Sequence, residues 1–326
     1  MKTFSDGSDM ADLALERYSL HGQTMGTKYS AVFFAPANMD TTAIGSALFA
    51  AVDRVDRQMS NWKPESDLNR LNRAPVNEWQ TVPKELLQVL TTALLVSKQS
   101  NGAFDIGVGD LVHAWGFGPS EGRSNAEQIR ALKSQTRLLA TDALEINSAL
   151  GQVRKRAPIT LDLSGIAKGY GVDQLGRCLD RFGITRYLVG IDGEMRARGT
   201  KPKGQPWAIA IEKPVRNLRE VMSVMELSNA AIASSGDYRN WLDYQGRSYS
   251  HTMNSILREP SSNRLAAVSV LANTCMLADA WATALMVLGE TAGVKLAQEL
   301  RMDALFVLHD GDEFQKISIA AGRIED

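Results

Sequence analysis

The 326-residue sequence is poor in cysteine and histidine, which limits the metal sites and covalent frameworks that it could form. Its two cysteines, Cys178 and Cys275, form no CxxC pair, so a disulfide framework, a zinc finger and an iron–sulfur cluster are excluded. The four histidines are too few for a His-rich metal cluster. A Walker A loop, an HExxH helix and a GxSxG elbow are also missing, which excludes the functions that these motifs indicate.

Charge and hydrophobicity exclude two further classes of partner. Lys plus Arg number 36 against 37 for Asp plus Glu, so a basic surface for nucleic acid or a polybasic membrane anchor is not expected. No stretch reaches the roughly 20 apolar residues of a membrane span. The first residues show no signal-peptide core and no lipid-acceptor cysteine. We therefore expect a cytoplasmic protein, or a periplasmic one if an export segment was trimmed from the sequence.

Residues 1–17 are expected to form a polar tail, and the spacing of apolar residues predicts the elements that follow. Helices are expected over 41–59 (capped by Asp40 or Thr41), from Pro83 through Leu94, after a Ser124 cap with Ile129 and Leu132, over Ala167–Phe182, and over about Leu277–Leu288. Strands are expected at Arg186–Val189, Trp207–Glu212, Val221–Leu227, Ala230–Ala233 and Leu265–Leu271. Strands that follow one another without helices favour mixed or antiparallel sheets, so the fold class is α+β.

Two segments could bind a phosphate or a metal, although each also has a purely structural interpretation. The run from Gly165 to Gly171 is glycine-dense at a strand-to-helix junction, which indicates either close helix packing or backbone amides that face a phosphate. Asp279 and Thr283 are four residues apart and share one helix face. Their oxygens suit Mg²⁺, but Asp279 could simply stabilise the first turn while Thr283 bonds back to its own helix.

Two polar loops are candidates for a role at a site. His251 lies between strand-like segments, where it is either a structural histidine or a base with a pKa near neutrality. The run Ser234-Ser235-Gly236-Asp237 is turn-like, and no base is identifiable beside its serines. We expect it to form a loop that hydrogen-bonds its own backbone or a ligand.

Taken in order, the motifs resemble those of the ApbE family, the FAD:protein FMN transferases. The motifs that match are Met25-Gly26-Thr27, Ser60-Asn61-Trp62, Ser66 to Asn72, Gly102 to Asp105, Trp115 to Gly118, Asp162 to Tyr170, Ser234 to Tyr238, Ser250-His251, and Ala278 to Gly289. They extend over about residues 20–310, and the resemblance implies a single domain of this type at 18–322. Each motif is weak alone, whereas the ordered set is specific.

The resemblance implies an enzyme that transfers FMN from FAD to a Thr or Ser hydroxyl of an acceptor protein and releases AMP. Family acceptors are membrane redox subunits or soluble flavoproteins with a short flavinylation sequence. The implied architecture is α+β and two-lobed, with mixed or antiparallel sheets flanked by helices, a T-fold-like arrangement, a central FAD cleft, and Mg²⁺ on the FAD diphosphate.

Matching positions also imply a role for individual residues. His251 would be the catalytic base. The metal ligands would be Asp279, the Thr283 hydroxyl and the Gly165 carbonyl. The residues implied to border FAD are Met25, Trp62, Ala103, Phe104, Asp105, Asp162, Lys168 and Met253, with Met25 and Trp62 at the flavin.

The sequence departs from the family pattern at two places. After His251 the usual Asp, Pro, Thr and Gly are replaced by Asn254, Ser255, Leu257 and Arg258. Because Arg258 cannot adopt a positive φ cheaply, we expect this loop to take another course, with the guanidinium near phosphate or acceptor. In the second place, the run from Ile191 to Glu194 keeps one glycine of the usual pair and adds two carboxylates, which indicates either a tolerant surface loop or altered acceptor choice.

These departures leave two alternatives to the transferase. One is a flavin carrier that binds FAD without efficient transfer. The other is a Mg²⁺-dependent FAD pyrophosphatase, in which water replaces the protein hydroxyl and FMN and AMP are released. The same metal site would serve either nucleophile.

Overall fold

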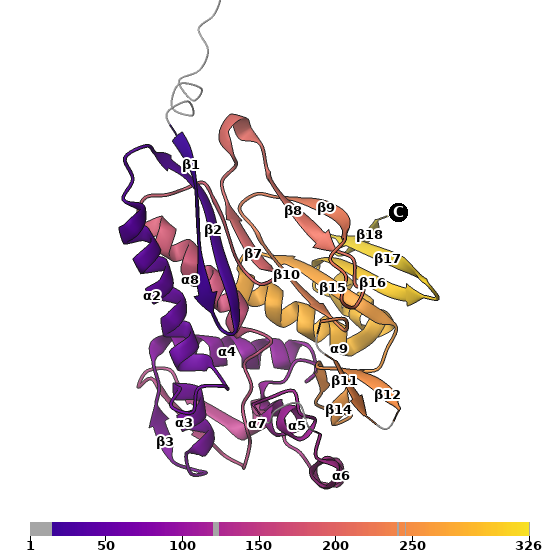
Figure 1. Cartoon of the computed structure of the whole chain (residues 1–326). Helices are drawn as coiled ribbons and strands as arrows, with labels where there is room; N and C mark the ends of the chain where they lie inside the picture. The colour runs from indigo at the N-terminus through magenta and orange to yellow at the C-terminus, as the bar shows by residue number, and fades with distance from the viewer. Residues whose placement is uncertain (1–14, 120–123, 240, 245, 326) are drawn as a thin grey trace, which may run out of the picture.

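The computed structural model describes residues 15–119, 124–239, 241–244 and 246–325. Its centre is an open nine-stranded sheet with the order β1-β2-β6-β7-β10-β15-β16-β17-β18 (Figure 1). Every strand pairing within the described residues is antiparallel. The α+β class is therefore confirmed, with antiparallel sheets.

The strands of the described residues have the following bounds. They are β1 (Leu15–Thr24), β2 (Thr27–Pro36), β3 (Trp79–Thr81), β4 (Leu144–Asn147), β5 (Gln152–Lys155), β6 (Tyr187–Ile191), β7 (Glu194–Arg198), β8 (Trp207–Glu212), β9 (Val221–Leu227), β10 (Ala231–Gly236), β11 (Trp241–Tyr244), β12 (Arg247–Ser250), β13 (Met253–Asn254), β14 (Glu259–Pro260), β15 (Leu265–Ala272), β16 (Asp303–Asp310), β17 (Glu313–Ala320) and β18 (Arg323–Glu325).

The helices lie between these strands in the chain. They are α2 (Thr41–Met59), α3 (Asp67–Arg73), α4 (Lys84–Gln99), α5 (Gly109–Ala114), α6 (Ala126–Ser134), α7 (Ala140–Ala143), α8 (Ala167–Arg181) and α9 (Cys275–Glu299), with short 3₁₀ turns at Ile106–Val108 and Pro202–Gly204. In the described part of the chain, no helix has both the length and the apolar character to cross a bilayer.

The two faces of the large sheet are covered differently, and strand β2 shows why. Its residues Ala31 and Phe33 are fully buried in a cluster with α2 and α8, whereas Val32 and Phe34 pack against the β8–β9 ribbon. Successive side chains of a strand point to opposite faces, so this alternation buries both sides of β2. Helices α2, α8 and α9 thus lie on one face and the β8–β9 ribbon on the other (Figure 1).

The helices expected from periodicity are present, with differences at their ends. Helix α2 has the predicted bounds, and the Asp40 side chain accepts hydrogen bonds from its first amides. The cap of α6 is Asn125 and not Ser124, because the Asn125 carboxamide accepts from the Gln128 amide. Helix α9 begins earlier than expected and resumes beyond Gly289, where φ is +76° and the helix is interrupted.

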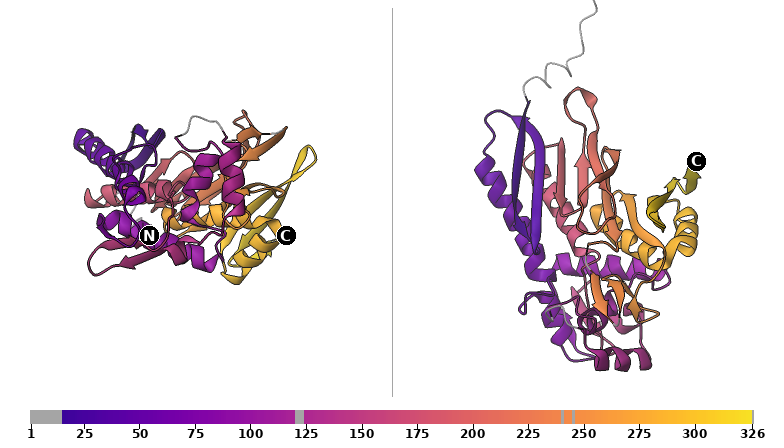
Figure 2. Two further views of the ribbon diagram at one scale, coloured as in Figure 1. Left: turned by 90° about the horizontal axis from the view of Figure 1, so that it is seen from below. Right: turned by 45° about the vertical axis from the view of Figure 1, so that its right-hand side comes forward.

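A second, mainly helical lobe lies below the sheet. Helices α3 to α7 and the three-stranded sheet β3–β5–β4 gather there, at the lower end of the molecule in both Figure 1 and the right-hand view of Figure 2. This matches the two-lobed expectation. The chain ends differ from it: residues 15–17 belong to β1 and 323–325 form β18, while the rest of the expected tail, residues 1–14, lies outside the described residues.

Candidate active site

A cavity of about 660 Å³ brings together segments that are far apart in the sequence. It contains eleven of the twelve residues expected at a site, namely Trp62, Ala103, Phe104, Asp105, Asp162, Gly165, Lys168, His251, Met253, Asp279 and Thr283. The twelfth, Met25, lines an adjoining cavity of about 510 Å³. Trp62, Ser164 and Lys168 line both cavities, so the two spaces meet at these residues.

Helices α8 and α9 bring Gly165, Asp279 and Thr283 together, because the two helices pack closely against each other at Gly169. A Cβ at Gly169 would lie 2.3 Å from the Cys275 carbonyl oxygen of α9, so no larger residue fits there. The Gly169 amide donates to the Asp279 carboxylate at 2.9 Å. Close helix packing thus accounts for Gly169, and Asp279 binds the first turn of α8 rather than serving only its own helix.

The expected metal ligands lie next to one another. A Cβ at Gly165 would be 3.0 Å from the Thr283 hydroxyl oxygen, which places these two residues in contact across the helix pair. Asp279 precedes Thr283 by one helical turn and is 6% exposed. A carboxylate, a hydroxyl and a backbone carbonyl are hard oxygen donors of the kind that Mg²⁺ prefers.

Asp279 and Lys168 are part of a charge cluster in which Asp279 and Glu194 are buried and Lys168 is partly exposed. Burial, then the negative charge of Glu194, raises the pKa of Asp279 to about 7, although Lys168 and the Gly169 amide oppose the shift. The Lys168 ammonium lies 2.6 Å from Glu194 and 3.7 Å from Asp192. Burial alone would lower the pKa of Lys168, but Glu194 and then Asp279 raise it overall. The neighbouring carboxylates thus favour the charged form of Lys168 beside the oxygen ligands.

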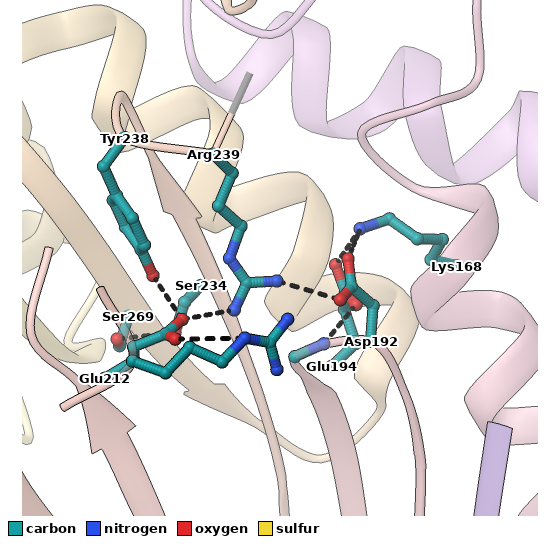
Figure 3. Close-up of polar contacts among 10 residues, drawn as sticks. Lys168, Asp192, Glu194, Glu212, Ser234, Tyr238, Arg239 and Ser269 are labelled. Atoms are coloured by element: carbon teal, nitrogen blue, oxygen red, sulfur yellow. Dashed lines mark hydrogen bonds and ion pairs between the residues drawn. The ribbon is translucent and has the colours of Figure 1, made fainter. Parts of the chain in front are cut away.

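The turn from Ile191 to Glu194 faces this cavity, so it is not a tolerant surface loop. It connects β6 to β7, and both of its carboxylates line the cavity. Glu194 is only 2% exposed, and Asp192 adopts a φ of +57°, in the left-handed region that favours glycine. Asp192 also forms an ion pair with Arg239 at 3.0 Å (Figure 3). Its carboxylate thus connects two cations of the site.

Two further carboxylates of the cavity, Asp105 and Asp162, are held by amides. One oxygen of Asp105 accepts from the Gly107 and Ala140 amides, while its other oxygen is buried without a hydrogen-bond partner. Burial raises the pKa of Asp105, against the effect of those two amides. Asp162 accepts from the Ser164 amide at 2.7 Å and from the Asn61 carboxamide at 2.5 Å. Asp105 therefore keeps a free acceptor for a ligand.

His251 lies between β12 and β13, as expected, and lines the cavity. Its ring is edge-on to Phe117, with the ring centroids 6.4 Å apart. Met253, two residues later, is buried in the same wall. The histidine thus lies in the cavity wall beside Phe117, just before the β13–β14 hairpin.

That hairpin contradicts the expectation for Arg258, because Arg258 does adopt a positive φ, +59°. The Asn254 side chain accepts from the amides of Ile256 and Leu257, and the Arg258 amide donates to the Asn254 carbonyl at 2.8 Å. The Arg258 guanidinium donates to the Gln135 carbonyl oxygen and not to a group at the cavity. The substituted run thus forms a compact, capped turn.

The serine pair also differs from its expectation. Ser234 and Ser235 belong to strand β10 rather than to a loop, and the Ser234 hydroxyl lies 2.7 Å from that of Ser269 on the neighbouring strand β15. Both serines line the cavity. Arg239, just after this strand, is a cavity residue that the sequence alone did not single out.

Comparisons with known proteins show to which family this chain belongs. A sequence profile described as the ApbE family matches residues 25–306. The chain belongs to the ApbE family. The FAD:protein FMN transferase of Vibrio cholerae is 35% identical over 92% of this chain and 90% of its own, and that of Escherichia coli K12 is 32% identical over 93% and 87%.

Solved structures agree with this assignment. The flavin transferase ApbE of Vibrio cholerae has a TM-score of 0.84 at 35% identity, covering 94% of this chain and 98% of its own. The apo flavinyl transferase ApbE of Pseudomonas stutzeri has a TM-score of 0.83 at 33% identity, covering 94% and 96%. The ApbE-like architecture expected for this chain is therefore confirmed.

Proposed function

We infer that this chain is an FAD:protein FMN transferase, and we propose that it moves FMN to a Thr or Ser hydroxyl with Mg²⁺ and releases AMP. The observation that supports this best is the junction of the two cavities. Lys168 lines both of them, and the Gly165, Asp279 and Thr283 cluster lies in the larger one. A dinucleotide needs this arrangement, since its diphosphate lies between two ring systems.

The charges of the larger cavity support the need for a metal. Among its described lining residues are five carboxylates, against one lysine and one arginine. The carboxylates are Asp105, Asp162, Asp192, Glu194 and Asp279. A diphosphate would be repelled by this surplus unless a cation entered with it. Bound Mg²⁺ would neutralise charge on the phosphate oxygens and polarise the phosphorus.

The donors available for that cation suit Mg²⁺ rather than zinc. No three His, Cys, Asp or Glu side chains gather into a metal cluster in the ranges that the structure describes. The ligands would instead be the Asp279 carboxylate, the Thr283 hydroxyl and the Gly165 carbonyl, with water and phosphate oxygens completing the shell. Such a mixed oxygen set with several exchangeable positions is typical of Mg²⁺ at phosphates.

The ring systems of FAD have matching surroundings. The smaller cavity is bordered by apolar side chains of Met25, Val55, Met59 and Leu163 and by Trp62, which suits a flavin ring. In the larger cavity the free oxygen of Asp105 could accept a hydrogen bond from a ring N–H, beside Ala103 and Phe104. Met253 and Asp162 would complete the walls around the ligand.

His251 is the proposed base for the acceptor hydroxyl. The hydroxyl oxygen forms the new bond to the FMN phosphorus, the bond from that phosphorus to the AMP oxygen breaks, and the hydroxyl proton passes to the imidazole. A positioned base of this kind contributes about 10²–10⁴-fold. The acceptor would be a protein with an exposed Thr or Ser, membrane redox subunits included.

One assay tests this function against hydrolysis and simple flavin binding. Purified protein is incubated with FAD, Mg²⁺ and an acceptor domain that contains the flavinylation sequence. Fluorescence of the acceptor on a denaturing gel and chromatography of nucleotides are then measured. Covalent fluorescence with AMP is expected, whereas free FMN with AMP would indicate a pyrophosphatase and unchanged co-purified FAD a carrier.

Two variants assign the roles in the same assay. Asp279→Ala is expected to abolish Mg²⁺-dependent turnover, and normal turnover would show that the metal assignment is wrong. His251→Ala is expected to bind FAD as before while transfer falls by about 10²–10⁴-fold. Undiminished transfer by that variant would remove His251 from the role of base.

A further inference from the structure

The turn between β6 and β7 contacts the guanidinium of Arg239. The Asp192 carboxylate binds one terminal nitrogen of the guanidinium at 3.0 Å, and the Glu212 carboxylate binds the other at 3.0 Å. A Cβ at Gly193 would lie 3.2 Å from that second nitrogen, so the guanidinium packs directly on the glycine. Figure 3 shows Arg239 between the two carboxylates. The side chain is therefore fixed from three sides.

The segment that presents Arg239 is also fixed. The Tyr238 hydroxyl donates to Glu212 at 3.2 Å, and a Cβ at Gly236 would lie 2.5 Å from the Tyr238 ring. Tyr238 thus packs back over the end of β10 and leaves Arg239 facing the cavity. Both anchors depend on a glycine, which indicates a built arrangement and not a chance surface ion pair.

Asp192 connects Arg239 to Lys168. One of its carboxylate oxygens contacts Arg239 at 3.0 Å, and the other lies 3.7 Å from the Lys168 ammonium. Among the described residues that line the larger cavity, Lys168 and Arg239 are the only lysine or arginine. The Asp192 carboxylate therefore lies between Arg239 and Lys168 and holds both cations close enough to contact a single diphosphate group.

Both cations retain donors after these contacts. A guanidinium has five N–H donors and an ammonium has three. Asp192 and Glu212 use two of the Arg239 donors, and Glu194 uses one of the Lys168 donors, because Asp192 at 3.7 Å is only an ion-pair contact of the ammonium. The remaining donors are available to a ligand in the cavity that both side chains line. Ionised donors of this kind bind phosphate oxygens strongly, and arginine does so with a planar pair of N–H groups.

We propose that Arg239 is a phosphate-contacting residue of the transfer reaction and that Asp192 positions it. This inference rests on the proposed function. The FAD diphosphate has two negative charges, whereas a phosphodiester on the acceptor plus AMP has three, and the hydroxyl proton goes to the base. Negative charge on the phosphates thus grows as the P–O bond to AMP breaks. A second fixed cation stabilises this change.

Direct binding measurements test the inference without turnover. AMP, adenosine, FMN and riboflavin are titrated into the full chain with Mg²⁺, and each affinity is compared between the wild type and Arg239→Gln. We expect the variant to lose about 10- to 100-fold in affinity for AMP, for FMN or for both. Binding of adenosine and riboflavin, which have no phosphate, should be unchanged. The AMP and FMN titrations show which phosphate Arg239 contacts.

Arg219→Gln is a matched control. Arg219 belongs to the same network, with its guanidinium 3.9 Å from Glu212, but its side chain is 90% exposed and does not line the cavity. This variant should bind all four ligands as the wild type does. Arg239→Lys, which keeps the charge, should recover part of the lost affinity. Equal losses in the Arg219 control, or equal losses for adenosine and riboflavin, would overturn the proposal.

Asp192→Asn tests the positioning role. If Asp192 mainly fixes Arg239, its replacement weakens the binding of the same phosphate ligands. If it mainly repels them, AMP and FMN bind more tightly, and the positioning role is refuted. Because binding is measured apart from transfer, a wild-type protein that binds AMP through Arg239 but never modifies an acceptor would contradict the proposed function alone.

Discussion

Replacement of Arg258 tests how the turn after His251 is stabilised. This residue has a φ of +59°, a conformation that costs a side chain about 1–2 kcal/mol relative to glycine. Its guanidinium donates to the Gln135 carbonyl oxygen of the helical lobe. The arginine thus combines an unfavourable backbone with a favourable contact, and two variants separate these effects.

Arg258→Ala keeps the backbone cost and removes the contact. We expect it to lower the free energy of unfolding by about 0.5–1.5 kcal/mol, the usual value of one hydrogen bond. Arg258→Gly also removes the contact, but it removes the cost of the positive φ as well. The greater freedom of glycine in the unfolded chain offsets about 0.5–1 kcal/mol of that gain. The glycine variant should therefore be more stable than the alanine variant by about 0.5–1 kcal/mol.

Urea unfolding monitored by tryptophan fluorescence measures both differences, provided that the dependence on denaturant is the same for each protein. Transfer activity of the two variants is measured beside it. An alanine variant as stable as the glycine variant would refute the left-handed turn. An alanine variant as stable as the wild type would show that the contact with Gln135 contributes nothing.

Three further predictions concern the crossing of α8 and α9 and the carboxylate of Asp279. Gly169→Ala places a Cβ 2.3 Å from the Cys275 carbonyl oxygen, so we expect a loss of about 1–3 kcal/mol in thermal or urea unfolding. Gly165→Ala, whose Cβ lies 3.0 Å from the Thr283 hydroxyl, should impair Mg²⁺-dependent turnover more than stability. For Asp279, the pKa is about 7 in the folded chain against 3.8 ordinarily, so the folded state prefers the protonated form. Stability in metal-free buffer should then fall as the pH rises from about 4 to about 7, and Asp279→Asn should flatten that fall; an unchanged pH profile would contradict it.

Much of the fold followed from local pattern. The spacing of apolar residues placed α2 and β8 at their observed bounds, because each of these elements buries one regular face, and β9 also has its expected bounds. The ends of elements were less predictable where two adjacent residues could each cap a helix, as Ser124 and Asn125 could at the start of α6. The break at Gly289 was foreseen as an end, but the chain resumes a helix because Gly293 and Ala297 pack against the core.

The site was partly predictable for a different reason. Residues such as Asp279 and Thr283 share a helix, so spacing alone put them on one face. Asp192 and Arg239 are 47 positions apart in the numbering and meet only because β7 and β10 are adjacent in the sheet. No local pattern reports such a contact, and a positive φ at Asp192 cannot be inferred from its type. Of the two cations of the cavity, only Lys168 was therefore expected from the sequence, and Arg239 was not.

The crossing of α8 and α9 joins stability to the proposed chemistry. Gly169 must be small for the helices to approach, and its amide then binds the carboxylate that is expected to hold the metal. The same approach brings Gly165 against Thr283. Any change that separates these helices would therefore disperse the oxygen ligands as well as reduce packing. Burial of Asp279 beside Glu194 also disfavours the ionised carboxylate, which lowers the stability of the folded chain at neutral pH when no cation is bound. A cation that binds the ionised carboxylate would remove this cost and thereby stabilise the folded chain. The site is thus expected to be stabilised by its own ligand.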